Sequence, residues 1–214
     1  MRLAPEDQQA SLLIASGVLM LAAGLTCWWF GIDLRLHVSM HLSAAVAPIF
    51  VRLSALGGSA ILIPVALVGV AFLLAQKRLA DAAWLFLTIA LGRLGIEALK
   101  LVLSRPRPPS ADWLEPINSW SFPSSHSAGT MMTGVALALL FGRGDGAILV
   151  ALFAALFIGW SRVALGVHWP SDVMAGWGIG LIWIGLAMSL RNAIAPEELD
   201  EPTPAPDAGS LDDL

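Results

Sequence analysis

Residues 11–30 read SLLIASGVLMLAAGLTCWWF, an apolar run that contains no Asp, Glu, Lys or Arg. A helix that crosses the hydrocarbon core of a bilayer needs roughly 20 mostly apolar residues, so this run predicts a membrane-spanning helix. Runs of similar character follow at residues 56–75, 81–103, 124–141, 147–165 and 172–190. The sequence therefore predicts an all-α, polytopic membrane protein, built as a bundle of six transmembrane helices.

The composition of the whole chain agrees with this prediction. Of its 214 residues, 57% are hydrophobic and 13% are charged, whereas soluble domains carry about 25% charged residues. Too few polar side chains remain to coat a soluble globule, which excludes a soluble enzyme. The single cysteine, Cys27, excludes a disulfide scaffold. Basic residues are too sparse for a nucleic-acid-binding surface, so we expect no nucleic-acid partner.

Three segments flank or interrupt the spans. Residues 1–10 form a short N-terminal segment before the six-helix domain, which we place at residues 11–190. Within that domain, residues 31–55 carry apolar side chains at three- and four-residue steps, which is typical of an amphipathic helix in the membrane interface. Residues 191–214 are rich in proline and contain seven acidic residues after position 194, and this composition predicts an acidic, disordered tail.

Polar residues concentrate in three segments of this apolar chain. They read KLVLSRPRP at residues 100–108, PSSH at residues 123–126 and SRVALGVHWPSD at residues 161–172. An Arg or Lys at the centre of a spanning helix costs roughly 2.5–3.5 kcal/mol, so such residues are candidates for a functional site. In a chain that crosses the membrane back and forth six times, all three segments emerge on the same face. We therefore expect them to form one pocket.

The three segments supply positive charge and hydrogen-bond donors to this pocket. Arg107 and Arg162 carry planar, forked donors that match phosphate oxygens, and Lys100 adds a point charge. Ser124 and Ser125 open the fourth span, and the free backbone N–H groups at a helix N-terminus favour an anion. The combination predicts a site for a multiply charged oxyanion, with phosphate as the first choice.

Two histidines lie in the second and third segments. Histidine titrates near neutral pH and therefore suits nucleophilic and acid–base chemistry. Asp172 follows His168 by four residues, a spacing that could place its carboxylate against the imidazole and fix the tautomer. His126 has no such acid nearby in the sequence and could donate a proton to a leaving oxygen. In-line transfer of a phosphoryl group needs attacking and leaving groups on opposite sides of the phosphorus atom.

Arg93 and Glu97 form another polar pair, four residues apart, inside the predicted span at residues 81–103. This spacing favours an ion pair on one face of a helix, and we expect the pair to face the interior of the bundle. The alternative is that Glu97 supports Lys100, which lies about one turn further along the helix.

Taken together, the three polar segments resemble the signature of the type-2 phosphatidic-acid phosphatase superfamily. The matching patterns are, in order, K-x6-R-P (Lys100, Arg107, Pro108), P-S-x-H (Pro123, Ser124, His126) and S-R-x5-H-x3-D (Ser161, Arg162, His168, Asp172). The superfamily includes bacterial phosphatidylglycerophosphate and undecaprenyl-diphosphate phosphatases, as well as soluble vanadium haloperoxidases. The apolar composition disfavours the haloperoxidase branch. One departure is Ser125, where the family commonly has glycine.

The resemblance implies an integral-membrane, metal-independent phosphatase that needs no cofactor and hydrolyses a lipid phosphate or diphosphate among the membrane lipids. In such an enzyme His168 is the nucleophile that forms a phosphohistidine, Asp172 orients His168, and His126 protonates the leaving group. The phosphate would be bound by Lys100, Arg107, Arg162, Ser124 and the backbone around Ser125. Undecaprenyl diphosphate, phosphatidylglycerophosphate and phosphatidate are the candidate substrates.

Two other functions are compatible with the same residues. A lipid phosphotransferase would pass the phosphoryl group from the same phosphohistidine to an acceptor hydroxyl, and a non-enzymatic phospholipid transporter or binding protein would use only the cations. If the site residues Lys100, Arg107 and Arg162 are left out of the count, five Lys and Arg residues lie on the side of the membrane that holds the termini and three lie on the other side. This distribution favours cytoplasmic termini. With the resemblance, it predicts a bacterial inner-membrane protein whose active site faces the periplasm and the outer leaflet.

Overall fold

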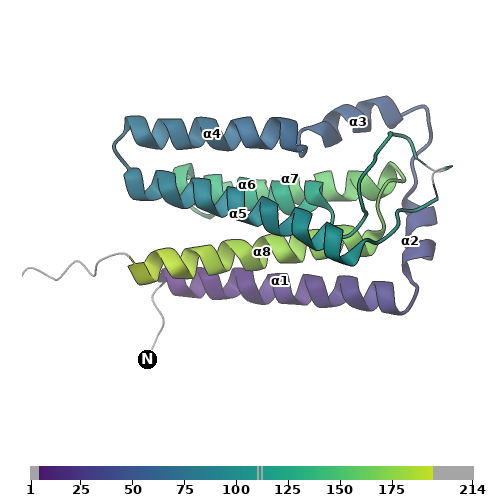
Figure 1. Ribbon diagram of the computed structural model, residues 1–214, viewed down its shortest axis with the longest axis horizontal. Helices are drawn as coiled ribbons and strands as arrows, with labels where there is room; N and C mark the ends of the chain where they lie inside the picture. Colours follow the sequence, from purple (N-terminus) through teal and green to yellow (C-terminus); the bar gives the residue numbers. More distant parts are fainter. Residues whose placement is uncertain (1–4, 110, 112, 195–214) are drawn as a thin grey trace, which may run out of the picture.

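Helices make up the regular secondary structure in the described part of the chain. The computed structural model describes residues 5–109, 111 and 113–194, and no strand occurs among them. The helices are α1 (Pro5–Trp29), α2 (Asp33–Met40), α3 (Ala47–Ala55), α4 (Ser59–Ala75), α5 (Leu79–Leu103), α6 (Ser125–Phe141), α7 (Asp145–Ala164) and α8 (Pro170–Ile194) (Figure 1). The all-α prediction is confirmed. The predicted tail lies outside the described residues from position 195 onwards.

Each predicted span coincides with a helix, but the helices differ in length and charge. Four segments are long and apolar enough to cross a membrane, namely Asp7–Trp29, Ala47–Ala75, Asp145–Ala164 and Pro170–Ala193. α6 is apolar but has only 17 residues. α5 has 25 residues, which include Asp81, Arg93, Glu97 and Lys100. Helix length and composition thus support four spans, and the six-span arrangement stays a prediction.

Residues 31–55 form two short helices, α2 and α3, where the sequence predicts one amphipathic helix. α2 ends at Met40, and α3 begins at Ala47 with Pro48 in its first turn. Proline fixes φ and lacks an N–H, which suits the first turn of a helix but not its interior. The buried residues of α2 are Asp33 and His37, so the polar side of this helix faces the protein.

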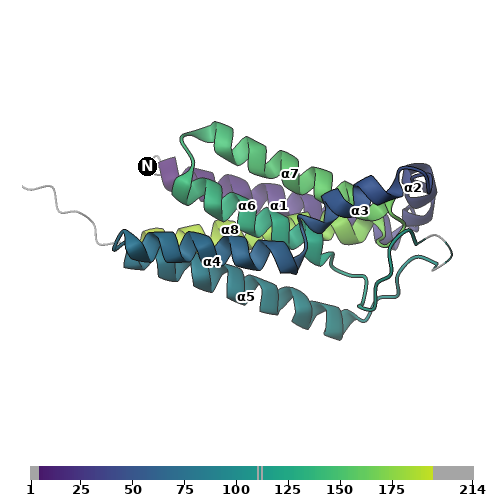
Figure 2. The ribbon, with the colours of Figure 1, turned by 90° about the horizontal axis from the view of Figure 1, so that it is seen from above.

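The long helices lie side by side in one bundle, in which α1 packs along α8 (Figures 1 and 2). α2, α3 and the connection between α5 and α6 gather at one end of the bundle, the right-hand end in Figure 1, where α8 also begins. The three polar segments of the sequence belong to this end. The arrangement therefore brings together residues that are far apart in the chain.

Small residues allow α1 and α8 to approach closely. A Cβ atom added at Gly178 would lie 2.6 Å from the carbonyl oxygen of Gly17 and 2.6 Å from the backbone nitrogen of Leu21. A Cβ at Gly185 would lie 2.8 Å from the carbonyl oxygen of Ala10. Such contacts between small residues are a common way for membrane helices to pack. α1 thereby supports the helix that carries Asp172.

Gly178→Ala should destabilise the protein, because the new Cβ would overlap the backbone of α1. Overpacking of this kind costs roughly 1–3 kcal/mol. Gly95→Ala is the matched control, because a Cβ at Gly95 meets no atom within 4 Å and alanine is the better helix former. Thermal unfolding midpoints in one detergent compare the two variants, and equal midpoints would contradict the close packing of α1 on α8.

Candidate active site

A cavity of about 200 Å³ lies where the polar segments meet. It is lined by Gly57, Ser59, Glu97, Lys100, Arg107, Ile117, Ser119, Ser125, His126 and His168. Five of the eight site residues that the sequence predicts are among these. The other three, Arg162, Ser124 and Asp172, are buried and do not line the cavity. The two predicted histidines thus face one small space.

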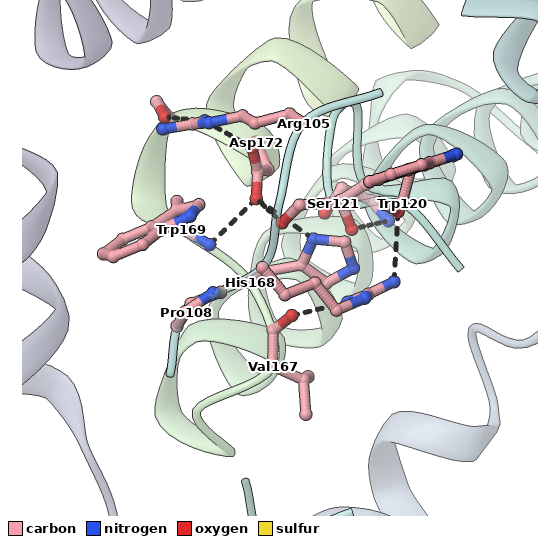
Figure 3. Close-up of polar contacts among 12 residues, drawn as sticks. Arg105, Pro108, Trp120, Ser121, Val167, His168, Trp169 and Asp172 are labelled. Atoms are coloured by element: carbon pink, nitrogen blue, oxygen red, sulfur yellow. Dashed lines mark hydrogen bonds and ion pairs between the residues drawn. The ribbon is translucent and has the colours of Figure 1, made fainter. Parts of the chain in front are cut away.

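His168 lies in the connection between α7 and α8, and Asp172 is in the first turn of α8. The Nδ1 atom of His168 is 3.3 Å from Oδ2 of Asp172, and both side chains are buried (Figure 3). One edge of the imidazole therefore faces a carboxylate, while the ring also lines the cavity. The four-residue spacing does bring the acid to the histidine.

Three further donors hold the Asp172 carboxylate. Its Oδ1 atom accepts a 2.5 Å hydrogen bond from Nη1 of Arg105. Its Oδ2 atom accepts hydrogen bonds from the backbone N–H of Trp169, at 2.9 Å, and from the hydroxyl of Ser121 (Figure 3). A buried charge is costly unless it is paired and hydrogen-bonded. These contacts satisfy the carboxylate oxygens and fix their position beside the imidazole.

Arg105 extends this network to α2. Its Nη2 atom is 2.7 Å from Oδ2 of Asp33, whose Oδ1 accepts a 2.9 Å hydrogen bond from the backbone N–H of Ser171. The guanidinium carbon also lies 4.2 Å from the centre of the Trp28 ring, a cation–π distance. Neither Arg105 nor Asp33 is among the site residues predicted from the sequence. The signal that could have found them is that each is a charge in apolar surroundings on the face predicted to hold the site.

Lys100 and Arg107 point their charged groups at backbone carbonyls. The Nζ atom of Lys100 donates to the carbonyl of Trp120 at 2.7 Å. Arg107 donates to the carbonyls of Ser119 and Val167 at 2.6 and 2.5 Å. Neutral acceptors orient the two side chains without cancelling their positive charge. Both cations line the cavity and can attract an anion there.

Arg162 is fully buried beneath the cavity residues. Its Nη1 atom donates to the hydroxyl of Ser54 at 2.7 Å and to a carboxylate oxygen of Glu115 at 2.8 Å. Its Nε and Nη2 atoms have no hydrogen-bond partner among the described residues. A buried guanidinium with uncommitted donors can serve a ligand. Glu115 is likewise not among the site residues predicted from the sequence.

The start of α6 opens towards the cavity. Ser124 is the N-cap of this helix, and its hydroxyl accepts a 3.4 Å hydrogen bond from the backbone N–H of Ser127. Ser125 donates its hydroxyl to Glu97 at 2.8 Å, and both Ser125 and His126 line the cavity. Backbone N–H groups at a helix N-terminus favour an anion. Ser124 therefore contributes by fixing the helix start, not by lining the cavity.

Arg93 and Glu97 do not form the ion pair that their spacing predicts. No ion pair with a nitrogen–oxygen distance of 4.0 Å or less joins these two described side chains; instead Nη1 of Arg93 donates to the hydroxyl of Ser59 at 2.6 Å, and Glu97 accepts from Ser125. The reason is that partners on α4 and α6 lie within reach of α5. Glu97 is thus tied to the start of α6.

The electrostatics of the site favour an anion. Burial, and then the charges of Arg107, Lys100 and Arg162, lower the pKa of His168 well below its usual value. Burial, and then Arg162, lower the pKa of Arg107 to about 10. The imidazole of His168 is therefore neutral at pH 7 before an anion binds. Across residues 5–109, 111 and 113–194, no three His, Cys, Asp or Glu side chains are arranged to hold a metal ion.

Two larger hollows adjoin the cavity. The first, which we call the groove, has a volume of about 470 Å³ and is lined by Ser59, Ile63, Ala66, Leu67, Val70, Phe86, Ile89, Ala90, Arg93, Leu94 and Glu97. The second, the vestibule, has about 790 Å³ and is lined by Glu97, Lys100, Leu101, Pro106, Arg107, Pro108, Pro109, Trp113, Ile117, Asn118, Ser119 and Trp120. The cavity shares lining residues with both hollows. It therefore adjoins both an apolar groove and a vestibule whose lining includes Lys100 and Arg107.

Comparisons with known proteins identify the family to which this chain is similar. The model of the PAP2 superfamily matches residues 81–195. An undecaprenyl-diphosphatase of Sulfolobus acidocaldarius is 31% identical over 178 residues, which cover 80% of this chain and 83% of that protein. A lipid A 1-phosphatase of Rhizobium johnstonii is 34% identical over 117 residues, or 50% of this chain and 46% of that protein. The crystal structure of a transmembrane PAP2-type phosphatidylglycerolphosphate phosphatase from Bacillus subtilis superposes with a TM-score of 0.74 at 25% identity, covering 88% of this chain and 98% of that one.

Asp33→Asn should destabilise the protein, because Asp33 and Arg105 form a buried ion pair with side chains that are each 7% exposed. Breaking a buried pair costs about 3–5 kcal/mol. Asp81→Asn is the matched control. It also faces two arginines, Arg78 and Arg191, but these are 38% and 45% exposed, and exposed pairs contribute about 0–1 kcal/mol. Thermal unfolding in detergent measures both losses, and a larger loss for Asp81→Asn would contradict this account of the network.

Proposed function

The chain belongs to the PAP2 superfamily, and on this basis we propose that it is an integral-membrane, metal-independent phosphatase that hydrolyses a lipid phosphate or diphosphate through a phosphohistidine. The observation that carries the proposal is the shared cavity. His126 and His168 line the same 200 Å³ as Lys100 and Arg107, and Asp172 lies behind His168. Binding of a head group alone would need the cations but not this histidine–aspartate pair.

In the first step, Nε2 of His168 attacks the phosphorus atom while the bond from phosphorus to the leaving oxygen breaks. His126 gives a proton to that oxygen, which leaves as part of the lipid alcohol or, for a diphosphate, as part of the lipid monophosphate. The lowered pKa of His168 supports this role, because a neutral imidazole has a free electron pair for attack. Asp172 orients the ring through Nδ1 and stabilises the positive charge that it gains.

In the second step, water attacks the phosphohistidine. His126, now neutral, accepts a proton from the water, the phosphorus–nitrogen bond breaks, and inorganic phosphate and free His168 are restored. Lys100, Arg107 and the backbone N–H groups around Ser125 stabilise the charge on the phosphoryl oxygens in both steps, and Arg162, which is buried behind the cavity, adds positive charge. Donors that are already oriented before reaction supply most of such stabilisation.

The groove supports a lipid substrate. It lies between α4 and α5, and apart from Ser59, Arg93 and Glu97 its walls are apolar. A hydrocarbon tail can lie there while the phosphate enters the adjoining cavity. We extend the proposal to six spans in a bacterial inner membrane, with the cavity towards the periplasm and the outer leaflet. The distribution of basic residues outside the site supports this orientation.

The direct test is phosphate release by the purified protein in detergent with EDTA. We expect release from lipid phosphates or diphosphates and little release from soluble phosphate esters, because only the lipids fill the groove. His168→Ala should lower the rate roughly 10³-fold or more, as expected for loss of a nucleophile. Near wild-type activity in this variant would remove His168 from the proposed role. Turnover that depends on an added alcohol, with little free phosphate, would instead identify a phosphotransferase.

Asp172→Asn should slow turnover by about 10²-fold or more with little change in KM, because the amide cannot stabilise a charged imidazole. Rapid-quench trapping of the phosphoenzyme from labelled substrate measures the rate of the first step, the formation of the phosphohistidine, directly. We expect the phosphoenzyme to form more slowly in this variant. Thermal unfolding serves as the control for folding. An unchanged rate of phosphoenzyme formation would exclude Asp172 from the first step.

A further inference from the structure

Arg162 shares one of its nitrogen atoms with a carboxylate. Its Nη1 atom lies 2.8 Å from Oε2 of Glu115 and 2.7 Å from the hydroxyl of Ser54. The side chain of Arg162 is 0% exposed, whereas that of Glu115 is 24% exposed. Glu115 belongs to the connection between α5 and α6. A residue outside the helices therefore supplies the negative partner of a buried positive charge.

The neighbours of Glu115 in the chain are held against the site. The backbone N–H of Leu114 donates to the carbonyl of Leu165 at 3.0 Å, and the ring N–H of Trp113 donates to the carbonyl of Pro108 at 3.0 Å. An apolar cluster secures the same segment, and its members are Trp113, Leu114, Ile117, Ala47, Leu165 and Val167. These contacts lie on both sides of Glu115 in the sequence, so they fix its position beside Arg162.

The charges of this ion pair act on the cavity from behind. Arg162 does not line the cavity, so in this structure it acts on an anion there through its charge. Burial, and then Arg162, lower the pKa of Arg107 to about 10, whereas the charges of Asp172 and Glu115 raise it. Arg107 lines the cavity, and charges interact over several ångströms inside a protein. Glu115 thus offsets part of the attraction that Arg162 exerts on an anion in the cavity.

Inorganic phosphate depends on this attraction more than a lipid phosphate does. A lipid whose phosphate lies in the cavity is also held by the hydrocarbon tail in the groove, because burial of apolar surface is favourable. Free phosphate has no tail, so charge and hydrogen bonds supply its whole binding energy. A carboxylate behind the cavity therefore weakens the binding of the free ion, while the tail still retains the lipid.

We propose that Glu115 limits the affinity of the cavity for inorganic phosphate by offsetting the charge of Arg162, and that this allows the product to leave. The proposal rests on the phosphatase activity proposed above and names a residue that sets product release from the same site. Glu115 acts through Arg162 and is a positioning residue, not a catalytic one.

The experiment compares inhibition by inorganic phosphate in the wild-type protein and in Glu115→Gln, with a lipid phosphate as substrate and at low ionic strength. The amide oxygen of glutamine can still accept from Nη1 of Arg162, but it carries no charge. We expect the inhibition constant of phosphate to be roughly three- to tenfold lower in the variant, because an ion pair that is partly exposed is screened by solvent. Progress curves should also slow at a lower concentration of released phosphate.

Thermal unfolding in detergent measures the same effect without turnover. Glu115→Gln should unfold at a lower temperature than the wild-type protein when phosphate is absent, because the buried charge of Arg162 loses its partner. Added phosphate should raise the midpoint of the variant more than that of the wild-type protein, because a ligand stabilises the state that binds it. A loss of stability that phosphate does not restore would show a structural role alone and overturn the proposal.

Two variants serve as controls. Ser54→Ala removes the other partner of Nη1 of Arg162 without a change of charge, and it should not tighten the binding of phosphate. Asp81→Asn removes a carboxylate that is also paired with an arginine, but Asp81 lies roughly 28 Å from Lys100 along the axis of α5. This separation exceeds the screening length of about 10 Å at 0.1 M salt, so the inhibition constant of phosphate should stay unchanged.

The outcomes separate this proposal from the function on which it rests. If the wild-type protein hydrolyses no lipid phosphate, the phosphatase activity is rejected, and thermal unfolding still tests the effect of Glu115 on phosphate binding. Hydrolysis together with equal or weaker phosphate binding in Glu115→Gln would overturn the proposal and leave the phosphatase intact. Equal tightening in Ser54→Ala would also overturn it, since release of Nη1, and not loss of charge, would then be the cause.

Discussion

The buried carboxylate of Asp172 is the contact on which the site depends. It accepts hydrogen bonds from Arg105, Ser121 and Trp169 and faces the His168 ring, while its own backbone carbonyl accepts from the N–H of Ser124 at 3.0 Å. One residue thus joins the start of α8, the start of α6 and the connection that follows α5. Because Arg105 also binds Asp33, α2 belongs to the same unit. The cavity keeps its shape only while these segments stay together.

The charges around the cavity are arranged so that positive charge remains for a ligand. Lys100 and Arg107 bind backbone carbonyls, which leave their charge uncompensated. By contrast, the arginines behind the cavity, Arg105 and Arg162, form ion pairs with acidic side chains. The same distribution keeps His168 neutral. A single set of contacts therefore provides both an anion site and an unprotonated imidazole within it.

Sequence reasoning predicted the helices and most of the candidate site, because both are encoded locally. Apolar runs identify helices, and the spacing of His168 and Asp172 lies within one turn. The pair of Arg105 and Asp33 joins residues 72 positions apart, and no periodicity reports such a contact. The division of residues 31–55 into α2 and α3 agrees with Pro48, which suits the first turn of a helix. The apolar pattern alone predicts one continuous helix and does not take this proline into account. Arg93 binds Ser59 and not Glu97 because α4 lies close to α5. The spacing of residues within α5 alone cannot predict this contact between helices.

The position of the cavity next to both the groove and the vestibule has a consequence for the release of products. The groove is apolar along most of its length, whereas the vestibule presents Lys100, Arg107, Asn118 and Ser119. Under the proposed function, the cleaved lipid and the released phosphate ion would each have a space of their own beside the cavity, the groove for the lipid and the vestibule for the ion. On that proposal, neither product would have to leave through the space occupied by the other.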